Sequence, residues 1–181
     1  MHGGPAAFAI RAVLASMMSP TYGIYSGYEL YENAPVRPGS EEYLNSEKYQ
    51  LRPRDFATPA ERGQSLEPFL TQLNEIRRAH PALQHLSGLA FHAVDNDALL
   101  CFSRRDEETG DTLLIVVTLQ PRGEYWGHLD LTMPALGLGW DDHFEAIDLT
   151  SGDRFPLHRH ATVRLEPTVH CAHIFEVHPY D

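Results

Sequence analysis

The pattern of apolar and polar residues changes near residue 86 and divides the chain into two halves. In the first half, apolar residues recur at helical spacing over residues 6–18 and again over residues 66–76, which predicts two helices. The first helix is expected to end before Pro20, because the residue that precedes a proline is disfavoured in the helical conformation. The aromatic and apolar run over residues 22–30 predicts a buried strand between the two helices.

A polar stretch over residues 31–56 follows the predicted strand. Long loops in compact domains tend to be functional, so we expect this segment to carry a site. The sequence TPAE at residues 58–61 is typical of a capping box, with Thr58 as the N-cap of a short helix. Ser65 is the expected N-cap of the longer helix that follows it.

The second half alternates between apolar and polar residues with a period of two, which is typical of β-strands. Turn sequences such as DND at residues 95–97 and SGD at residues 151–153 separate the segments. Many short strands at fairly regular spacing predict an antiparallel sandwich. The expected strands cover residues 89–94, 98–104, 113–119, 125–131, 145–149, 154–157, 162–165 and 172–177.

The first half is difficult to explain as a complete domain. Its predicted strand has no partner within its own half, and a lone buried strand leaves both of its edges without hydrogen bonds. The order helix, strand, long loop, helix is that of the closing segment of a larger α/β structure. We therefore expect residues 1–85 to belong to a larger domain and residues 86–181 to fold independently.

The composition limits the partners and the compartment. The 181 residues include 25 acidic and 14 basic ones, a net charge of −11, which argues against nucleic acid and anionic membranes as partners. The longest apolar run, over residues 5–18, is too short to span a bilayer and lacks the charged flank of a signal peptide. Two cysteines, Cys101 and Cys171, make no disulfide framework. We expect a cytoplasmic protein without a cofactor.

Several segments carry a resemblance to known enzymes. Residues 73–83 (LNEIRRAHPAL), 24–29 (IYSGYE) and 99–120 are similar to the last barrel helix, the eighth barrel strand and the first sandwich strands of the α-amylase superfamily. Residues 19–55 (SPTYGIYSGYELYENAPVRPGSEEYLNSEKYQLRPRD) are far more specific. They resemble the bacterial α-1,4-glucan:maltose-1-phosphate maltosyltransferase family, a member of glycoside hydrolase family 13.

The resemblance implies a fold and an activity. The family has a (β/α)8 catalytic TIM barrel followed by a C-terminal β-sandwich, so residues 1–85 would hold the last helix, strand and helix of the barrel and residues 86–181 the sandwich. The family transfers maltosyl units from α-maltose 1-phosphate to the non-reducing end of α-1,4-glucans and releases phosphate. It retains the anomeric configuration through a covalent glycosyl-enzyme.

The resemblance also implies which groups and partners lie elsewhere. The nucleophile Asp, the acid/base Glu and the stabilising Asp of the family lie on barrel strands upstream of the matched residues. The chain is therefore expected to hold no catalytic residue and to be inactive alone. The expected partners are α-maltose 1-phosphate, an α-1,4-glucan acceptor, the rest of the catalytic barrel and, in the intact protein, a second copy in a homodimer.

A Lys-Tyr pair of the family, which contacts the donor phosphate, matches Lys48 and Tyr49 in the sequence SEKYQLR. The chemistry suits that role, because an ammonium supplies a point charge for a phosphate and a phenol supplies a directed hydrogen bond. The loop after the eighth strand lies at the C-terminal face, where barrel enzymes keep their chemistry. Without the resemblance, a solvated lysine beside a surface aromatic is the simpler interpretation.

Other polar residues favour structural interpretations. The late histidines are weak evidence for zinc by their spacing; they are His158, His160, His170, His173 and His178, with Cys171 among them. On strands, His158 and His160 would share one face, as would Cys171 and His173, but nothing in the sequence brings these two pairs together. We expect no metal site. Glu29 is a candidate for catalysis or sugar binding, but a carboxylate satisfied by backbone donors is preferred. Glu41, Glu42 and Glu47 are expected on a solvated face.

The aromatic residues Tyr125, Trp126 and Trp140 could stack on sugar rings, although such residues lie more often in the core, which we prefer. Two other functions stay open beside the maltosyltransferase. One is a non-catalytic β-sandwich module that binds glucan or braces a partner. The other is part of a different α-amylase-superfamily hydrolase or transferase, which would lack the Lys-Tyr phosphate site.

Overall fold

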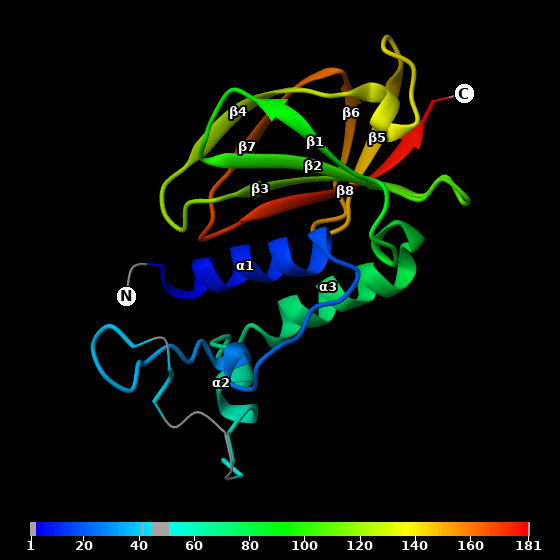
Figure 1. Ribbon diagram of the computed structural model, residues 1–181. Coiled ribbons are helices and arrows are strands. Elements are labelled where there is room, and N and C mark those ends of the chain that lie inside the picture. Colours follow the sequence, from blue (N-terminus) through cyan, green and yellow to red (C-terminus); the bar gives the residue numbers. More distant parts are fainter. Residues whose placement is uncertain (1–2, 41, 45–50, 181) are drawn as a thin grey trace.

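The computed structural model describes residues 3–40, 42–44 and 51–180 (Figure 1). In this part of the chain the α-helices are α1 (Gly4–Met18), α2 (Ala57–Glu61) and α3 (Glu67–Ala79). Short 3₁₀ turns cover Tyr28–Leu30, Pro81–Leu83 and Met133–Leu136. The strands are β1 (Leu89–Val94), β2 (Leu99–Arg105), β3 (Thr112–Thr118), β4 (Tyr125–Asp130), β5 (His143–Asp148), β6 (Arg154–His158), β7 (His160–Leu165) and β8 (Ala172–Pro179).

The two long helices form where the sequence predicts them. Helix α1 ends ahead of Pro20 and buries Val13 and Met17, which lie four residues apart on one face. Helix α3 is amphipathic and buries Leu73 and Ile76 on the face that meets α1 and the sheet. Among the described residues, no helix combines the length and the apolar character needed to cross a membrane.

The start of α2 differs from the prediction. Thr58 lies inside α2 and is not its N-cap. The carboxylate of Asp55 accepts a hydrogen bond from the backbone N–H of Thr58 at 3.1 Å, so an upstream side chain already satisfies a free donor of the first turn. The N-cap of α3 is Leu66 and not Ser65, so this prediction was wrong by one residue, although the hydroxyl of Ser65 accepts the backbone N–H of Glu67 at 3.1 Å.

The strand predicted over residues 22–30 is not formed, and this prediction was wrong. The segment runs irregularly and then makes the 3₁₀ turn Tyr28–Leu30. No described strand lies beside it, so an extended conformation would have left its backbone groups without sheet partners. Its aromatic rings pack on α1 instead: the rings of Tyr28 and Tyr31 lie 4.9 and 5.4 Å from that of Phe8.

The β-domain, defined as β1 to β8, is an antiparallel sheet with the order β6-β5-β8-β3-β2-β1-β4-β7. Strands β6 and β7 lie at opposite ends of this order, yet only Arg159 separates them in the sequence. The sheet must therefore curl until its two ends meet, which gives a nearly closed barrel (Figure 1). The antiparallel β-domain predicted from the sequence is confirmed in this form.

The described residues form two hydrophobic cores on opposite faces of the sheet. The outer core lies between the sheet and helices α1 and α3, which run along one face of it (Figure 1). The inner core fills the inside of the curled sheet. Strand β3 is buried on both faces, because Leu113, Ile115 and Val117 join the outer core while Leu114 and Val116 join the inner one.

Two buried arginines hold the C-terminal end of α1. Arg77 of α3 donates hydrogen bonds to the backbone carbonyls of Ser16, Ser19 and Pro20, the last two at 2.8 and 2.6 Å. Arg104 of β2 donates to the carbonyl of Met18 at 2.8 Å. These bonds satisfy carbonyls that the end of a helix leaves without partners. Burial lowers the pKa of both guanidinium groups.

Candidate functional site

The predicted donor-phosphate pair lies outside the described residues. Lys48 and Tyr49 fall within residues 45–50, of which the structure gives no account, so their role stays a prediction. Glu47 and Glu41 also lie outside the described residues, while Glu42 is exposed as expected. What the structure describes is the part of the loop on either side of the pair.

The two sides of this loop are joined by ionic contacts around Glu32. Arg54 donates two hydrogen bonds to the Glu32 carboxylate, at 3.0 and 3.2 Å, and a third to the hydroxyl of Ser26 at 3.0 Å. The Arg54 side chain is only 4% exposed, which makes this a partly desolvated bidentate pair. Arg52 lies 3.7 Å from the same carboxylate and donates to the carbonyl of Leu44 at 3.4 Å. The bond between Arg52 and Leu44 links described residues on either side of positions 45–50.

Gly27 allows this close approach. Its φ of 100° lies in the left-handed region, and a Cβ there would meet the Glu32 carboxylate at 2.4 Å. The N–H of Gly27 donates to the carboxylate of Glu29 at 3.0 Å, and the Glu29 carbonyl accepts the N–H of Leu66 at 2.8 Å. Glu29 is therefore a structural carboxylate with a backbone donor, as preferred from the sequence.

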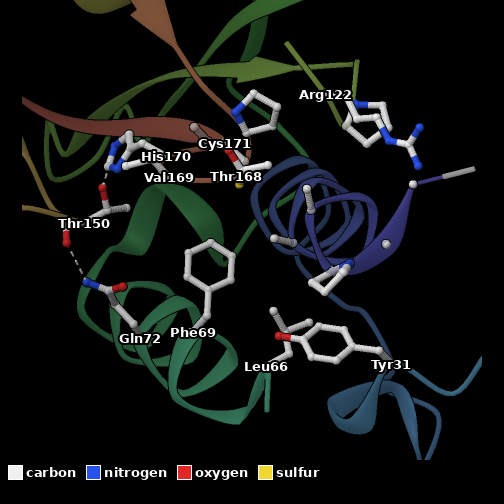
Figure 2. A pocket seen from close by; sticks show the side chains of 18 residues that line it. Tyr31, Leu66, Phe69, Gln72, Arg122, Thr150, Thr168, Val169, His170 and Cys171 are labelled. Atoms are coloured by element: carbon white, nitrogen blue, oxygen red, sulfur yellow. Dashed lines mark hydrogen bonds between the residues drawn. The ribbon is translucent and has the colours of Figure 1, made fainter. Parts of the chain in front are cut away.

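A cavity of about 680 Å³ lies between the start of α1, the first half of α3 and the loop that precedes β8. Figure 2 shows Phe69 of α3 at the cavity, with Thr150 linked by hydrogen bonds to both Gln72 and His170 on one wall. Most of the lining is apolar or backbone. Its other labelled residues are Tyr31, Leu66, Arg122, Thr168, Val169 and Cys171.

Asp148, His170 and His173 form a compact cluster at the edge of this cavity. One carboxylate oxygen of Asp148 lies 2.6 Å from Nδ1 of His173 and 3.3 Å from Nε2 of His170. The other oxygen accepts the hydroxyl and the N–H of Thr150 at 2.7 and 2.9 Å. Burial raises the pKa of Asp148, but the hydrogen bonds from His170, His173 and Thr150 outweigh it and hold that pKa well below its usual range.

The structure groups these histidines differently from the sequence pattern. The pattern pairs His158 with His160 and Cys171 with His173, and it does not point to Asp148. The structure brings His170 to His173, with ring centroids 4.7 Å apart, while His158 lies near His143 at 5.4 Å on other strands. Two features of the sequence could have indicated this cluster. One is Asp148 at the end of a strand with Thr150 two residues later, and the other is the sequence HCAH at residues 170–173.

The two cysteines are free thiols. Cys171 lines the cavity, but burial raises its pKa to about 11, and burial raises that of Cys101 to about 12. A thiol must ionise to act as a nucleophile, so neither cysteine is one near neutral pH.

The expectation that the tryptophans lie in the core was wrong. Trp126 and Trp140 are 57% and 50% exposed. An arginine covers each ring: Arg164 lies 5.8 Å from the centre of Trp126 and Arg159 lies 5.0 Å from that of Trp140. Tyr125 is partly buried against the inner core.

The chain is similar to known proteins of one enzyme family. The family model described as "GLGE, C-terminal" matches residues 91–177. The chain is 56% identical over 176 residues to an alpha-1,4-glucan:maltose-1-phosphate maltosyltransferase of Mycolicibacterium smegmatis. The aligned residues cover 97% of this chain and 25% of that protein. The chain belongs to this maltosyltransferase family. The maltosyltransferase of Corynebacterium pseudotuberculosis is 52% identical over 176 residues, with 97% of this chain and 26% of that protein covered.

These matches confirm the family resemblance carried by residues 19–55. The chain spans about a quarter of the length of the maltosyltransferases it matches. Its fold is also similar to that of a maltogenic alpha-amylase, AmyB from Thermotoga neapolitana, with a TM-score of 0.65 over 98% of this chain and 38% of that one. At 11% identity this second likeness shows the fold alone.

Proposed function

We propose that the intact protein transfers maltosyl units from α-maltose 1-phosphate to the non-reducing end of α-1,4-glucans and releases phosphate. The observation that carries the proposal is the 56% identity over 176 residues to a protein named for this reaction. The configuration at the anomeric carbon is retained, through a covalent glycosyl-enzyme. The product is a longer α-glucan.

The chain contributes two parts to that enzyme. Residues 1–85 belong to the (β/α)8 catalytic barrel, and residues 86–181 form the C-terminal β-domain. The catalytic Asp, Glu and Asp belong to barrel strands outside this chain, and the chain alone is inactive. The packing of α1 and α3 on the outer face of the sheet supports an arrangement in which the β-domain rests against the barrel.

Lys48 and Tyr49 contact the phosphate of the donor. Two features support this assignment: the motif match, and the contacts of Glu32 with Arg52 and Arg54, which lie a few residues after the pair in the sequence. The ammonium of Lys48 would neutralise part of the phosphate charge.

The intact enzyme acts in the cytoplasm, as a homodimer, on α-maltose 1-phosphate and an α-1,4-glucan acceptor. The two cysteines support a reducing compartment, because both are free in the structure. The net charge of −11 supports uncharged or locally bound anionic substrates over nucleic acid.

The first test is an assay of the purified chain. It is incubated with α-maltose 1-phosphate and glycogen, and released phosphate is measured. We expect no release above a blank without protein, because the covalent route has no nucleophile to start it. Release in proportion to added chain would contradict the assignment of the catalytic groups to the rest of the barrel.

The second test uses the intact enzyme and the variant Lys48→Ala. Loss of a charge-assisted hydrogen bond to phosphate lowers kcat/KM for α-maltose 1-phosphate by about tenfold to a hundredfold. Lys48→Arg restores only part of the activity, and Tyr49→Phe costs less than Lys48→Ala. The matched control is Arg37→Ala, which removes an exposed cation from the same loop. With maltosyl fluoride, a donor that has no phosphate, each of these variants should keep most of its activity. Equal losses of activity with both donors would contradict the proposal.

A second function is favoured by the outer core. The β-domain braces the helices, because α1 and α3 bury their apolar faces on β3 and its neighbours. This bracing role accompanies catalysis and does not replace it. It predicts that damage to the outer core lowers the stability of the enzyme more than its affinity for the donor.

A further inference from the structure

The cluster of Asp148, His170 and His173 offers three ligand atoms that converge from separate places in the chain. Asp148 ends β5, His170 lies in the loop before β8, and His173 lies on β8. The three ligand atoms all lie within 4.8 Å of one another. Strand β5 pairs with β8, which is what brings these residues together. We propose that Asp148, His170 and His173 bind a divalent transition-metal ion of the zinc class.

The distances suit such an ion. Two ligands on a tetrahedral zinc, each about 2.0–2.2 Å from the metal, lie roughly 3.3–3.5 Å apart. The Asp148 oxygen and Nε2 of His170 are 3.3 Å apart, already at that spacing. The same oxygen and Nδ1 of His173 are 2.6 Å apart, as in a hydrogen bond. Binding requires this second pair to open by less than about 1 Å, as the metal replaces the shared proton.

The ligand types also suit zinc. Imidazole nitrogen and carboxylate oxygen are both ordinary zinc ligands, and two histidines with one carboxylate is a set found in zinc sites. The Asp148 side chain is 1% exposed and ionised, so it needs no deprotonation before it binds a cation. In the metal-free protein the two imidazoles satisfy this buried carboxylate.

The surroundings hold each ligand in position. Nε2 of His173 lies 3.3 Å from the carbonyl of Arg164, which leaves Nδ1 for the metal. Phe175 stacks on the His173 ring at 5.0 Å and 13°, which fixes the plane of the ring. Thr150 binds the second oxygen of Asp148 and leaves the first for the metal. Partners of this kind orient the ligands in known metal sites.

The site has a route for the metal and for a fourth ligand. His170 and Thr150 both line the cavity of about 680 Å³. Figure 2 shows them side by side at its wall. A water from the cavity completes four-fold coordination. The sequence-based expectation of no metal considered residue spacing alone and did not include Asp148.

A second group, His80, Asp111 and Glu176, is less suited to zinc. One Asp111 oxygen accepts the N–H of Ala82 at 2.9 Å, and the other lies 2.9 Å from Nδ1 of His80. Glu176 is paired with His178 at 3.0 Å. This group has one imidazole and two carboxylates that already have partners, so the cluster at Asp148 is the stronger site among the described residues.

The test is a metal titration of the full chain after treatment with a chelator. Co²⁺ serves as a spectroscopic probe, because in a four-coordinate site it absorbs strongly in the visible range, and calorimetry with Zn²⁺ gives the stoichiometry. We expect one ion per chain and an intense four-coordinate Co²⁺ spectrum. Loss of a residue that only hydrogen-bonds to a metal ligand costs about 10–100-fold in metal affinity. Loss of a ligand itself, in His170→Ala, should therefore weaken binding by more than about tenfold.

The matched control is His158→Ala, which removes an exposed imidazole from the histidines on β6 and β7 and should leave the affinity unchanged. His170 is the main test position because it is partly exposed and its replacement leaves Asp148 with His173 and Thr150. A thermal melt with excess Zn²⁺ is the second measurement: the melting temperature should rise in the parent chain and not in His170→Ala. A weak, six-coordinate Co²⁺ spectrum, or Zn²⁺ binding that is lost in His158→Ala and kept in His170→Ala, overturns the proposal.

Discussion

The outer and inner cores share strand β3, yet they depend on different parts of the chain. The inner core is made by residues that lie between Leu99 and Val177, all within the β-domain. The outer core combines residues of the helices, such as Val13 and Leu73, with residues of the sheet, such as Phe102. A division of the chain at residue 86 therefore leaves the inner core whole and cuts the outer core in two.

Because of this difference, the two halves of the chain should differ in their ability to fold alone. Residues 86–181 contain every strand of the sheet and a complete core, which is what independent folding requires. The described helices α1 and α3 pack on each other and on the sheet, so the sheet supplies the rest of the apolar surface that they need. The predicted boundary between residues 85 and 86 therefore leaves the whole inner core on one side, but the outer core has residues on both sides of it.

The largest effect is expected from separating the two halves. Residues 86–181 alone should still melt cooperatively, because the inner core is retained, but with a melting temperature lower by more than about 10 °C, since the outer core contributes more than about 2 kcal/mol. The exposed outer face should bind the dye ANS. Calorimetry and dye fluorescence measure both effects.

Residues 1–83 serve as the counterpart of that experiment. Without the sheet, α1 and α3 keep only each other as apolar partners, and one helix pair covers too little surface to bury Val13 and Leu73 fully. We expect no cooperative melt. A sharp transition in this half, with dispersed NMR signals, would show that the helices carry a core of their own.

The second prediction compares neighbouring leucines on β3. Leu113 faces the outer core and Leu114 the inner core, and both are fully buried. In the full chain, Leu113→Ala and Leu114→Ala should each cost about 2–5 kcal/mol in the free energy of unfolding. In the fragment 86–181, Leu114→Ala should keep its cost, while Leu113→Ala should fall below about 1 kcal/mol because the position has become a surface one.

Denaturant unfolding of the four variants and their two parent proteins measures these costs. Each residue is the control for the other, since the two substitutions remove the same atoms from the same strand. If Leu113→Ala were as costly in the fragment as in the full chain, the outer face would not depend on the helices.

The third prediction concerns the contacts at the end of α1. Arg77→Met keeps much of the apolar stem and removes the donors to the carbonyls of Ser16, Ser19 and Pro20. Hydrogen bonds to charged groups contribute about 1.5–3 kcal/mol, so we expect a loss in this range. The neighbouring Arg78 is exposed, and Arg78→Met should change stability by less than about 0.5 kcal/mol. Chemical denaturation of the two variants makes the comparison, and equal effects would mean that the Arg77 guanidinium contributes nothing to the outer core.

The smallest effect at neutral pH is expected at His92 of β1. Nδ1 of His92 accepts the N–H of Thr132 at 3.1 Å, and Nε2 has no partner among the described residues. Burial lowers the pKa of His92 to about 4. An unfolded chain takes up this proton near pH 6.5. The unfolded state therefore binds more protons than the folded state between pH 6.5 and 4, and stability is complete above that window and falls as the pH drops through it.

The variant His92→Leu removes this titration. The difference in unfolding free energy between parent and variant should then change by up to about 1.4 kcal/mol per pH unit between pH 6.5 and 4, in favour of the variant at low pH. Urea unfolding at several pH values gives the slope. Parallel pH profiles for the two proteins would show that His92 does not stay neutral in the fold.

Sequence reasoning worked where structure is decided locally. Alternation and turn residues are local signals, and β1 has the bounds that were predicted, 89–94. The strand expected over residues 22–30 failed, because a strand also requires a neighbour and the sequence does not name one. The family resemblance could be recognised from the sequence alone, because residues 19–55 form one continuous motif.

The candidate sites show the same limit. Asp148 and His173 are 25 positions apart and meet because β5 pairs with β8, a pairing that no local pattern gives. Glu32 and Arg54 meet across 22 positions for a similar reason. The exposure of Trp126 was missed because an aromatic residue on a strand is compatible with either face until the curvature of the sheet is known.

The arginines at the end of α1 also influence the order in which the chain folds. The carbonyl of Ser16 receives its hydrogen bond from a residue 61 positions later, and the carbonyl of Met18 from one 86 positions later. During synthesis the chain emerges from its N-terminus, so the last turn of α1 has neither partner when it leaves the ribosome. Closing such distant contacts is slow, and α1 reaches its final packing only after β2 has been made.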